Sequence, residues 1–298
     1  MMKSAASLLM ALVVSSIASS PAFAAFKGSV EFTAAEIQGQ NKNLNTIIQT
    51  ASNCLEDHLE EHRRFFQRYG ISAFYGDRSA FAKMSTAQKK AHIASLGKDP
   101  ALLSQMKPTS CVGLTLTCLG KGFVNAGQAG TWKKIADFTK ANDQDGTAMQ
   151  DALRKLGWVV LYWNPDPTKN AVWDAREKAK DPQNKERFWG YHVYRYQTVT
   201  SAKQNYYFNA VNDIETLVGF KTSIPAKFAN VPFYVGTAHT GYHVFPGSYG
   251  NVIEGHSTRS IDDPQTLESS EFNPLADGGG PRGTYRSGLI ALPPGFGF

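Results

Sequence analysis

The stretch that decides the fold is TSCVGLTLTCLGKGF, residues 109–123. Its apolar residues recur at helical spacing and run into glycines that can end a helix. They are Val112, Leu116, Leu119 and Phe123. A small polar pair precedes Cys111, so we expect Cys111 in the first turn of a buried helix. There the unpaired N–H groups and the positive end of the helix dipole favour the thiolate, which is the nucleophilic form. A purely structural cysteine would suit an apolar helix equally well.

The first 24 residues have the pattern of a secretory signal. Lys3 supplies the positive charge, residues 8–14 the apolar segment, and Ala22-Phe23-Ala24 the small-x-small cleavage site. No cysteine follows the apolar segment closely enough for a lipid anchor, and no later run approaches the roughly 18 apolar residues of a membrane span. The sequence therefore predicts a periplasmic or secreted protein without a membrane anchor.

The charge balance is mildly basic. The 298 residues carry a formal charge of +6, or +5 once Lys3 is removed with the signal. This excess suits contact with an anionic surface such as a bacterial wall. Because Lys and Arg form no dense cluster, we expect no nucleic-acid partner.

Three cysteines remain after export, so at least one thiol stays unpaired in an oxidising compartment. Cys111 and Cys118 are seven residues apart, which is about 10.5 Å along a helix and too far for a bond. If a disulfide forms, we expect it between Cys54 and Cys118. Three reduced thiols are the alternative.

The N-terminal region, residues 25–100, has a helical pattern. Apolar residues recur at three- and four-residue spacing from Asn43 until Tyr69-Gly70 ends the run, and Ser85 is the expected N-cap of a second helix through Leu96. The first helix contains His58-Leu59-Glu60-Glu61-His62, an H-x-x-E-H pattern. His58 and His62 would share a face and could bind zinc with Glu61 beside a bound water. The alternative is a solvated face with charge pairs.

The segment of about residues 131–230 is predicted as an aromatic-rich insertion. Residues 132–138 and 147–156 have the pattern of short helices, and residues 158–163 and 191–196 that of strands. Residues 168–187 are highly charged and predicted as loop or exposed helix. The aromatic side chains could line a groove that stacks sugars or peptides, or they could form a local core.

Residues 233–245 and 251–257 alternate as a β-hairpin around a turn at 246–250. His239 and His243 then share one face of the first strand, and Glu254 and His256 share one face of the second. A four-residue loop would place His239 opposite His256, and a six-residue loop opposite Glu254. In either register His243 faces Val252 or Gly250. We therefore expect His239 to be the base of a cysteine–histidine pair, with a polar neighbour to orient it. Polar strand histidines without a catalytic role are the alternative.

Both stretches resemble the NlpC/P60 cysteine peptidases of the papain-like group. Cys111-Val112-Gly113-Leu114 is similar to the family's D-C-S-G-hydrophobic helix start, with Ser110 in place of the aspartate. Residues 239–244, with Gly247 and Val252-Ile253-Glu254-Gly255, are similar to its H-V-G-I-Y-x-G…V-I-x-A hairpin. The resemblance covers about 40 residues. It implies Cys111 as nucleophile, His239 as base and Glu254 as orienting group, with His256 as the alternative for that role.

The expected protein is therefore an α+β cysteine hydrolase. A papain-like, NlpC/P60-type catalytic region would occupy residues 101–298, with a catalytic helix packed on a small antiparallel sheet and a helical elaboration at 25–100. The resemblance implies cleavage of amide bonds in peptidoglycan peptides or another peptide substrate, with no cofactor. The alternatives are acyl transfer, deamidation or proteolysis of a protein substrate at the same site, a non-catalytic wall-binding or inhibitory protein, and a zinc peptidase at His58, Glu61 and His62.

Overall fold

The computed structural model describes residues 26–143, 146–165, 191–196, 214–221, 231–238, 243–248, 251–270 and 288–296. Its helices are α1 (Ala34–Lys42), α2 (Leu44–Tyr69), α3 (Ala80–Lys83), α4 (Thr86–Ser95), the 3-10 helix η1 (Pro100–Gln105), α5 (Cys111–Asn125), α6 (Ala129–Ala141) and α7 (Gly146–Lys155). Its strands are β1 (Phe74–Gly76), β2 (Lys107–Thr109), β3 (Val159–Pro165), β4 (Tyr191–Tyr196), β5 (Ile214–Lys221), β6 (Tyr234–Ala238), β7 (His243–Ser248), β8 (Asn251–Gly255), β9 (Leu267–Ser270) and β10 (Gly288–Leu292). This mixture confirms an α+β chain.

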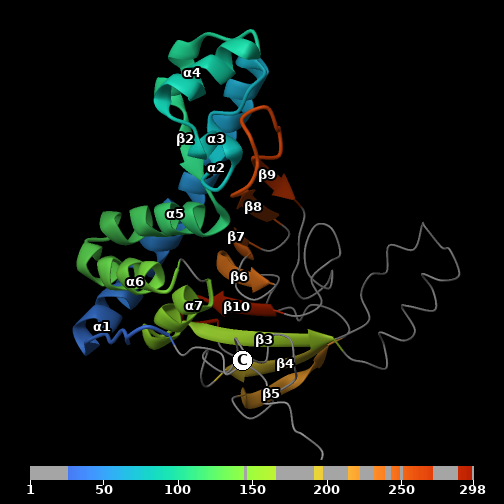
Figure 1. Ribbon diagram of the computed structural model, residues 1–298. Helices are drawn as coiled ribbons and strands as arrows, with labels where there is room; N and C mark the ends of the chain where they lie inside the picture. The colour runs from blue at the N-terminus through green and yellow to red at the C-terminus, as the bar shows by residue number, and fades with distance from the viewer. Residues whose placement is uncertain are drawn as a thin grey trace, which may run out of the picture.

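An antiparallel sheet of eight strands organises the described part of the chain, in the order β5-β4-β3-β10-β6-β7-β8-β9. Helices α5, α6 and α7 lie along one side of it, and α3 and α4 form an arm beyond β9 (Figure 1). Strand β10 lies between β3 and β6 and pairs with both. The segment predicted as an insertion thus contributes three strands to the same sheet as the predicted hairpin.

The helical N-terminal pattern is confirmed. Helix α2 ends at Tyr69 and is capped by Gly70 with a left-handed φ of 68°, the conformation that glycine adopts without steric cost. Helix α4 begins after Ser85, whose hydroxyl accepts a hydrogen bond from the Gln88 N–H while the Gln88 side chain accepts one from the Ser85 N–H. This reciprocal capping box fixes the start of α4 where the sequence predicts it.

Helix α5 is the central helix, packed between α2 and strands β7 and β8. Phe123 and Leu119 are completely buried in the core, so truncating Phe123 to alanine would cost about 3–5 kcal/mol. Gly122 lets the two helices approach closely, because a Cβ there would stand 2.3 Å from the Ile47 carbonyl oxygen. A disulfide joins Cys54 of α2 to Cys118 of α5, which confirms the predicted pairing.

The predicted hairpin is wrong in both its strand and its register. Strand β6 ends at Ala238, which pairs with His243 at the start of β7, so the chain reverses between them. Strands β7 and β8 pair through Gly247 with Val252 and Ser248 with Asn251. Only two residues connect them, in place of the four or six predicted.

The hairpin was mispredicted because Pro246, which is typical of a turn, lies inside a strand. Proline usually marks a turn, yet Pro246 pairs with Val235 inside the β6–β7 ladder. The alternation of residues 233–245 predicts one long strand, whereas β6 ends at Ala238 and β7 begins at His243. His239 lies outside the described residues, as do residues 1–25 with the predicted signal and residues 166–190 with most of the charged segment.

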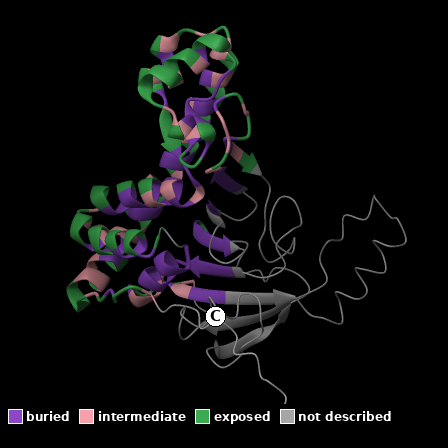
Figure 2. Cartoon of the chain, in the orientation of Figure 1, coloured by how far each residue is buried: buried purple, intermediate pink, exposed green. Residues whose placement is uncertain are grey.

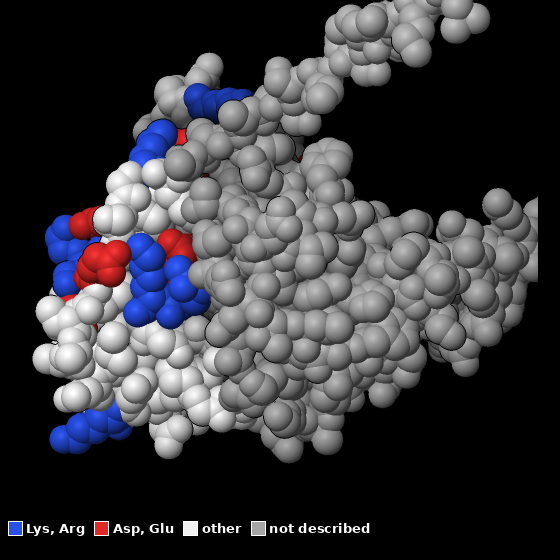
Figure 3. All heavy atoms as spheres, turned by 90° about the horizontal axis from the view of Figure 1, so that it is seen from below, with Lys and Arg blue, Asp and Glu red and all other residues white. Residues whose placement is uncertain are grey.

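The pattern of buried and exposed residues follows the packing of the helices on the sheet. The helical surfaces that face the sheet are buried, whereas the arm of α3 and α4 is largely exposed (Figure 2). Among the described residues on the face seen in Figure 3, Lys and Arg lie beside Asp and Glu and form no continuous basic surface. Ion pairs of the described residues include Lys27 with Asp143 and Lys155 with Glu31. None of the described helices is long and apolar enough to cross a membrane.

Candidate functional site

Cys111 is the first residue of α5, as predicted. The Ser110 hydroxyl caps the helix by accepting a hydrogen bond of 3.1 Å from the Gly113 N–H. Cys111 is half-buried and forms no disulfide. Its thiol therefore lies at the end of the helix where the dipole favours a thiolate.

Strand β8 ends against this helix start. A Cβ on Gly255 would stand 2.5 Å from the Thr109 hydroxyl oxygen and 3.3 Å from the Ser110 carbonyl oxygen. Only a residue without a side chain permits this approach. The backbone on either side of Gly255 is thereby held beside the residues that precede Cys111, whereas the side chains of Glu254 and His256 point to the face of the strand opposite the Cβ position of Gly255.

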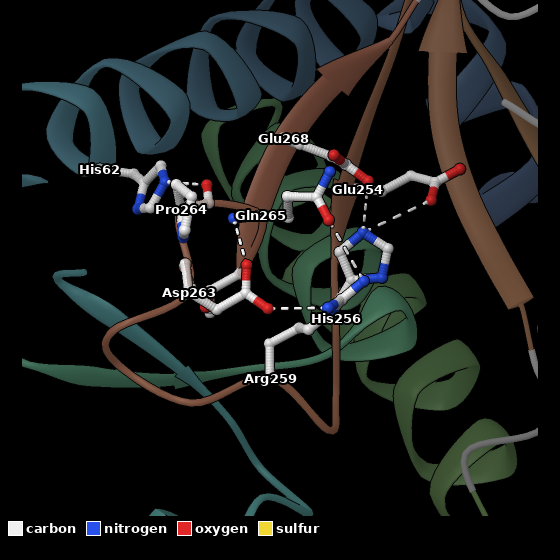
Figure 4. Close-up of polar contacts among 9 residues, drawn as sticks. His62, Glu254, His256, Arg259, Asp263, Pro264, Gln265 and Glu268 are labelled. Carbon is white, nitrogen blue, oxygen red and sulfur yellow. Dashed lines mark hydrogen bonds and ion pairs between the residues drawn. The ribbon is translucent and has the colours of Figure 1, made fainter. Parts of the chain in front are cut away.

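Glu254, His256 and Glu268 form a polar cluster at the end of β8 (Figure 4). Glu254 and Glu268 are directly opposite each other on β8 and β9. His256 Nε2 lies 2.8 Å from Glu268 Oε1 and 3.9 Å from Glu254 Oε2. Because a carboxylate only accepts hydrogen bonds, the ring proton of His256 is on Nε2, and this N–H donates a hydrogen bond to Glu268. Glu254 and His256 are candidates predicted from the sequence, whereas Glu268 is not, because it is followed by serines in a segment without a strand pattern.

The loop between β8 and β9 is held rigid beside this cluster (Figure 4). Arg259 Nη1 donates to Asp263 Oδ2 over 2.7 Å, and Thr266 donates to the Ser260 carbonyl over 2.7 Å. Asp263 Oδ1 also accepts from the Gln265 N–H. These bonds fix the path by which the chain returns from His256 to Glu268.

His62 anchors the same loop from α2. Its Nε2 donates to the Pro264 carbonyl over 2.9 Å, so Nδ1 accepts from the Ser72 hydroxyl, also over 2.9 Å. Desolvation by burial is the main cause that lowers the pKa of His62 below its usual value near 6.5. His62 is thus a buried structural histidine in one fixed tautomer.

The described geometry does not assemble the zinc alternative. His58 Nδ1 donates to the Cys54 carbonyl over 2.7 Å, and both ring nitrogens of His62 are hydrogen-bonded within the protein. Glu61 pairs with Lys107 over 2.8 Å. Among the described residues, two other groups bring three metal-binding side chains together. They are Cys54 with His58 and Cys118, and Glu254 with His256 and Glu268.

A half-open cavity of about 280 Å³ adjoins α5. It is lined by Ser110, Gly113, Leu114 and Thr117 on one side of the helix, by β2, and by His58, Phe74 and Asp77. Its lining is mixed, with Lys107 and Asp77 of opposite charge. Cys111 begins the same helix but is not among the described lining residues.

Comparisons of the chain with protein-family models, with curated proteins and with solved structures found no match. The functional assignment therefore depends on the geometry of the site and on the resemblance of the two motifs.

Proposed function

We propose that this chain is an exported cysteine hydrolase that cleaves amide bonds, with peptides of peptidoglycan as its substrate. The observation that carries the proposal is the convergence of two predicted motifs on one place. The helix that starts at Cys111 begins beside the end of β8, where Gly255 lies against Thr109 and Ser110, so the backbone that carries Glu254 and His256 passes close to the helix start. This agrees with a papain-like arrangement of a catalytic helix on an antiparallel sheet.

We assign the general base to His243. The preference for His239 depended on a hairpin register that differs from the observed one. Continuing the observed register along both strands brings His243 level with His256, and β7 is one of the strands that α5 contacts. Because this register aligns His243 with His256, we assign His243, in place of His239, as the partner of Cys111.

The chemistry follows from these positions. The Cys111 thiolate attacks the carbonyl carbon of the scissile amide, and the tetrahedral oxyanion accepts hydrogen bonds from N–H groups of the first turn of α5. His243 protonates the leaving amine and then activates the water that hydrolyses the thioester. Glu254 is the orienting group, and His256, bonded to Glu268, is the other candidate for that role.

Incubation of the protein with purified peptidoglycan, followed by mass spectrometry of the released fragments, tests the proposal. Wild-type protein should release peptides cut at one type of amide bond, and Cys111→Ala should release none while its circular dichroism and melting temperature stay unchanged. Iodoacetamide should abolish activity and EDTA should not. Full turnover by Cys111→Ala would refute the cysteine mechanism. Inactivation by EDTA with recovery on adding zinc would favour a metal site, for which Glu254, His256 and Glu268 are the described candidates.

A further inference from the structure

We propose that Cys54, His58 and Cys118 bind a zinc ion when their disulfide is reduced, so that the same residues clamp α2 to α5 in both redox states. The site is separate from the proposed catalytic residues and does not depend on the proposed hydrolase activity. It takes a borderline-soft divalent cation through two thiolates and one imidazole.

The ligand atoms are already close to zinc geometry. His58 Nδ1 lies 3.6 Å from Cys54 Sγ and 3.9 Å from Cys118 Sγ. In a tetrahedral zinc site with Zn–S of about 2.3 Å and Zn–N of about 2.0–2.1 Å, a nitrogen and a sulfur ligand are about 3.6 Å apart. The imidazole therefore stands at a coordination distance from both sulfurs.

The backbone also allows the change. Cys54 and His58 are four residues apart on α2 and share one face of the helix, and the Cα atoms of Cys54 and Cys118 are 5.3 Å apart. After reduction the two sulfurs must separate to about 3.8 Å, the edge between two thiolates around zinc. Rotation of the cysteine side chains provides that separation without moving the helices.

The zinc site forms by reduction of the disulfide followed by metal binding. A dithiol reductant supplies two electrons and two protons to the disulfide, becomes a disulfide itself and leaves two thiols. Zinc binding then releases both thiol protons. His58 gives up its bond to the Cys54 carbonyl, carries its ring proton on Nε2 and coordinates through Nδ1. Since His58 lines the cavity beside α5, a water molecule from that cavity can complete the tetrahedron.

The consequence concerns the position of α5. Cys54 and Cys118 are almost completely buried between the two helices, at 3% and 1% exposure. Without a cross-link, the contact between the two helices would rely on side-chain packing and on the hydrogen bond that Asn125 donates to the Thr50 hydroxyl. Bound zinc would hold α5, and with it Cys111, against α2 before the disulfide forms.

Cobalt and zinc titration of the full chain tests the site. The protein is purified with a phosphine reductant in place of a thiol, freed of metal and titrated with Co²⁺. One equivalent should produce thiolate-to-cobalt charge-transfer absorption and the intense visible bands of tetrahedral cobalt, and Zn²⁺ should abolish both. The oxidised chain should show neither. Cys111→Ser, the matched control, should bind as wild type does.

Variants of the ligands complete the test. Cys54→Ser and Cys118→Ser should lose the tetrahedral cobalt spectrum. His58→Gln keeps both thiols and should weaken zinc binding by more than about tenfold. Its zinc affinity decides the question if a cysteine variant fails to fold. The proposal is refuted if reduced wild type shows no charge-transfer absorption, if Cys111→Ser loses it, or if His58→Gln binds zinc as tightly as wild type.

Discussion

Gly255 lies against Thr109 so closely that a Cβ on the glycine would stand 2.5 Å from the threonine hydroxyl oxygen. This contact joins the end of β8 to the residues that precede Cys111. It makes the distance between Cys111 and the end of β8 depend on the absence of a single side chain.

Gly255→Ala should therefore displace the start of α5. We expect a lower melting temperature, because overpacking of this kind costs about 1–3 kcal/mol, together with at least a tenfold loss of turnover. Gly130→Ala in α6 is the matched control, since nothing lies within 4 Å of its Cβ position, and helical alanine is favoured over glycine by about 0.5–1 kcal/mol. Differential scanning calorimetry and peptide release would measure both. An unchanged Gly255→Ala enzyme would show that the contact does not position the site.

Substitutions of His239 and His243, the two histidines of the predicted hairpin, should affect turnover unequally. We expect His243→Ala to lower the turnover number by about 10³–10⁶-fold, the range seen when a cysteine or serine hydrolase loses its base. His239→Ala should act mainly on substrate affinity. Steady-state kinetics that separate kcat from KM decide between them. If His239→Ala were the inactive variant and His243→Ala the active one, the earlier assignment of His239 as base would be restored.

Glu254 and Glu268, the two carboxylates beside His256, should contribute unequally to turnover. Glu254→Gln should lower kcat by about 10²–10⁴-fold if Glu254 orients the base. Glu268→Gln should have a smaller effect, because Glu268 acts through His256, whose Nε2 it binds at 2.8 Å. The pH profile of kcat/KM distinguishes positioning from structural damage, since a merely destabilised enzyme keeps the wild-type profile. A larger loss in His256→Ala than in Glu254→Gln would transfer the orienting role to His256.

The buried His62 should make stability depend on pH. Its pKa is lowered in the folded protein by burial, so below a pH of about 6.5 the unfolded chain binds more protons than the folded chain. The free energy of unfolding should consequently fall as the pH is lowered through this range, and level off below the folded pKa. In urea titrations at pH 7.5 and pH 5, His62→Gln should lose less stability on acidification than wild type. Equal losses would show that other groups cause the pH dependence.

The sequence predicted local elements well and long-range pairing poorly. Helix α5, the end of α2 at Gly70 and the cap at Ser85 follow from spacing and capping residues close together in sequence. Helix geometry excludes the Cys111–Cys118 pair but leaves Cys54 with either partner, so the expected Cys54–Cys118 bond is fixed only by the packing of α2 on α5. The position of β10 between β3 and β6 depends on pairing with strands far away in the chain.

The residues of the candidate site also divide into those that local sequence predicts and those that depend on long-range strand pairing. Cys111 could be found from its helix, since a helix start is a local signal. The partner of His256 could not, because Glu268 becomes its neighbour only through the pairing of β8 with β9. The prediction of His239 as the base depended on a register that Pro246 obscured, because a proline inside a paired strand has the same local signature as a turn.

The place of β10 in the sheet has a consequence for when the chain can fold. Leu292 pairs with Val159, and Ala291 pairs with both Val160 and Val235, so the two halves of the sheet stay unjoined until residues 288–292 are in place. Contacts between residues this far apart in sequence make folding slow. If the chain is exported, as we propose, slow folding would keep the polypeptide unfolded during transport, and Cys111 would acquire its surroundings only on the far side of the membrane.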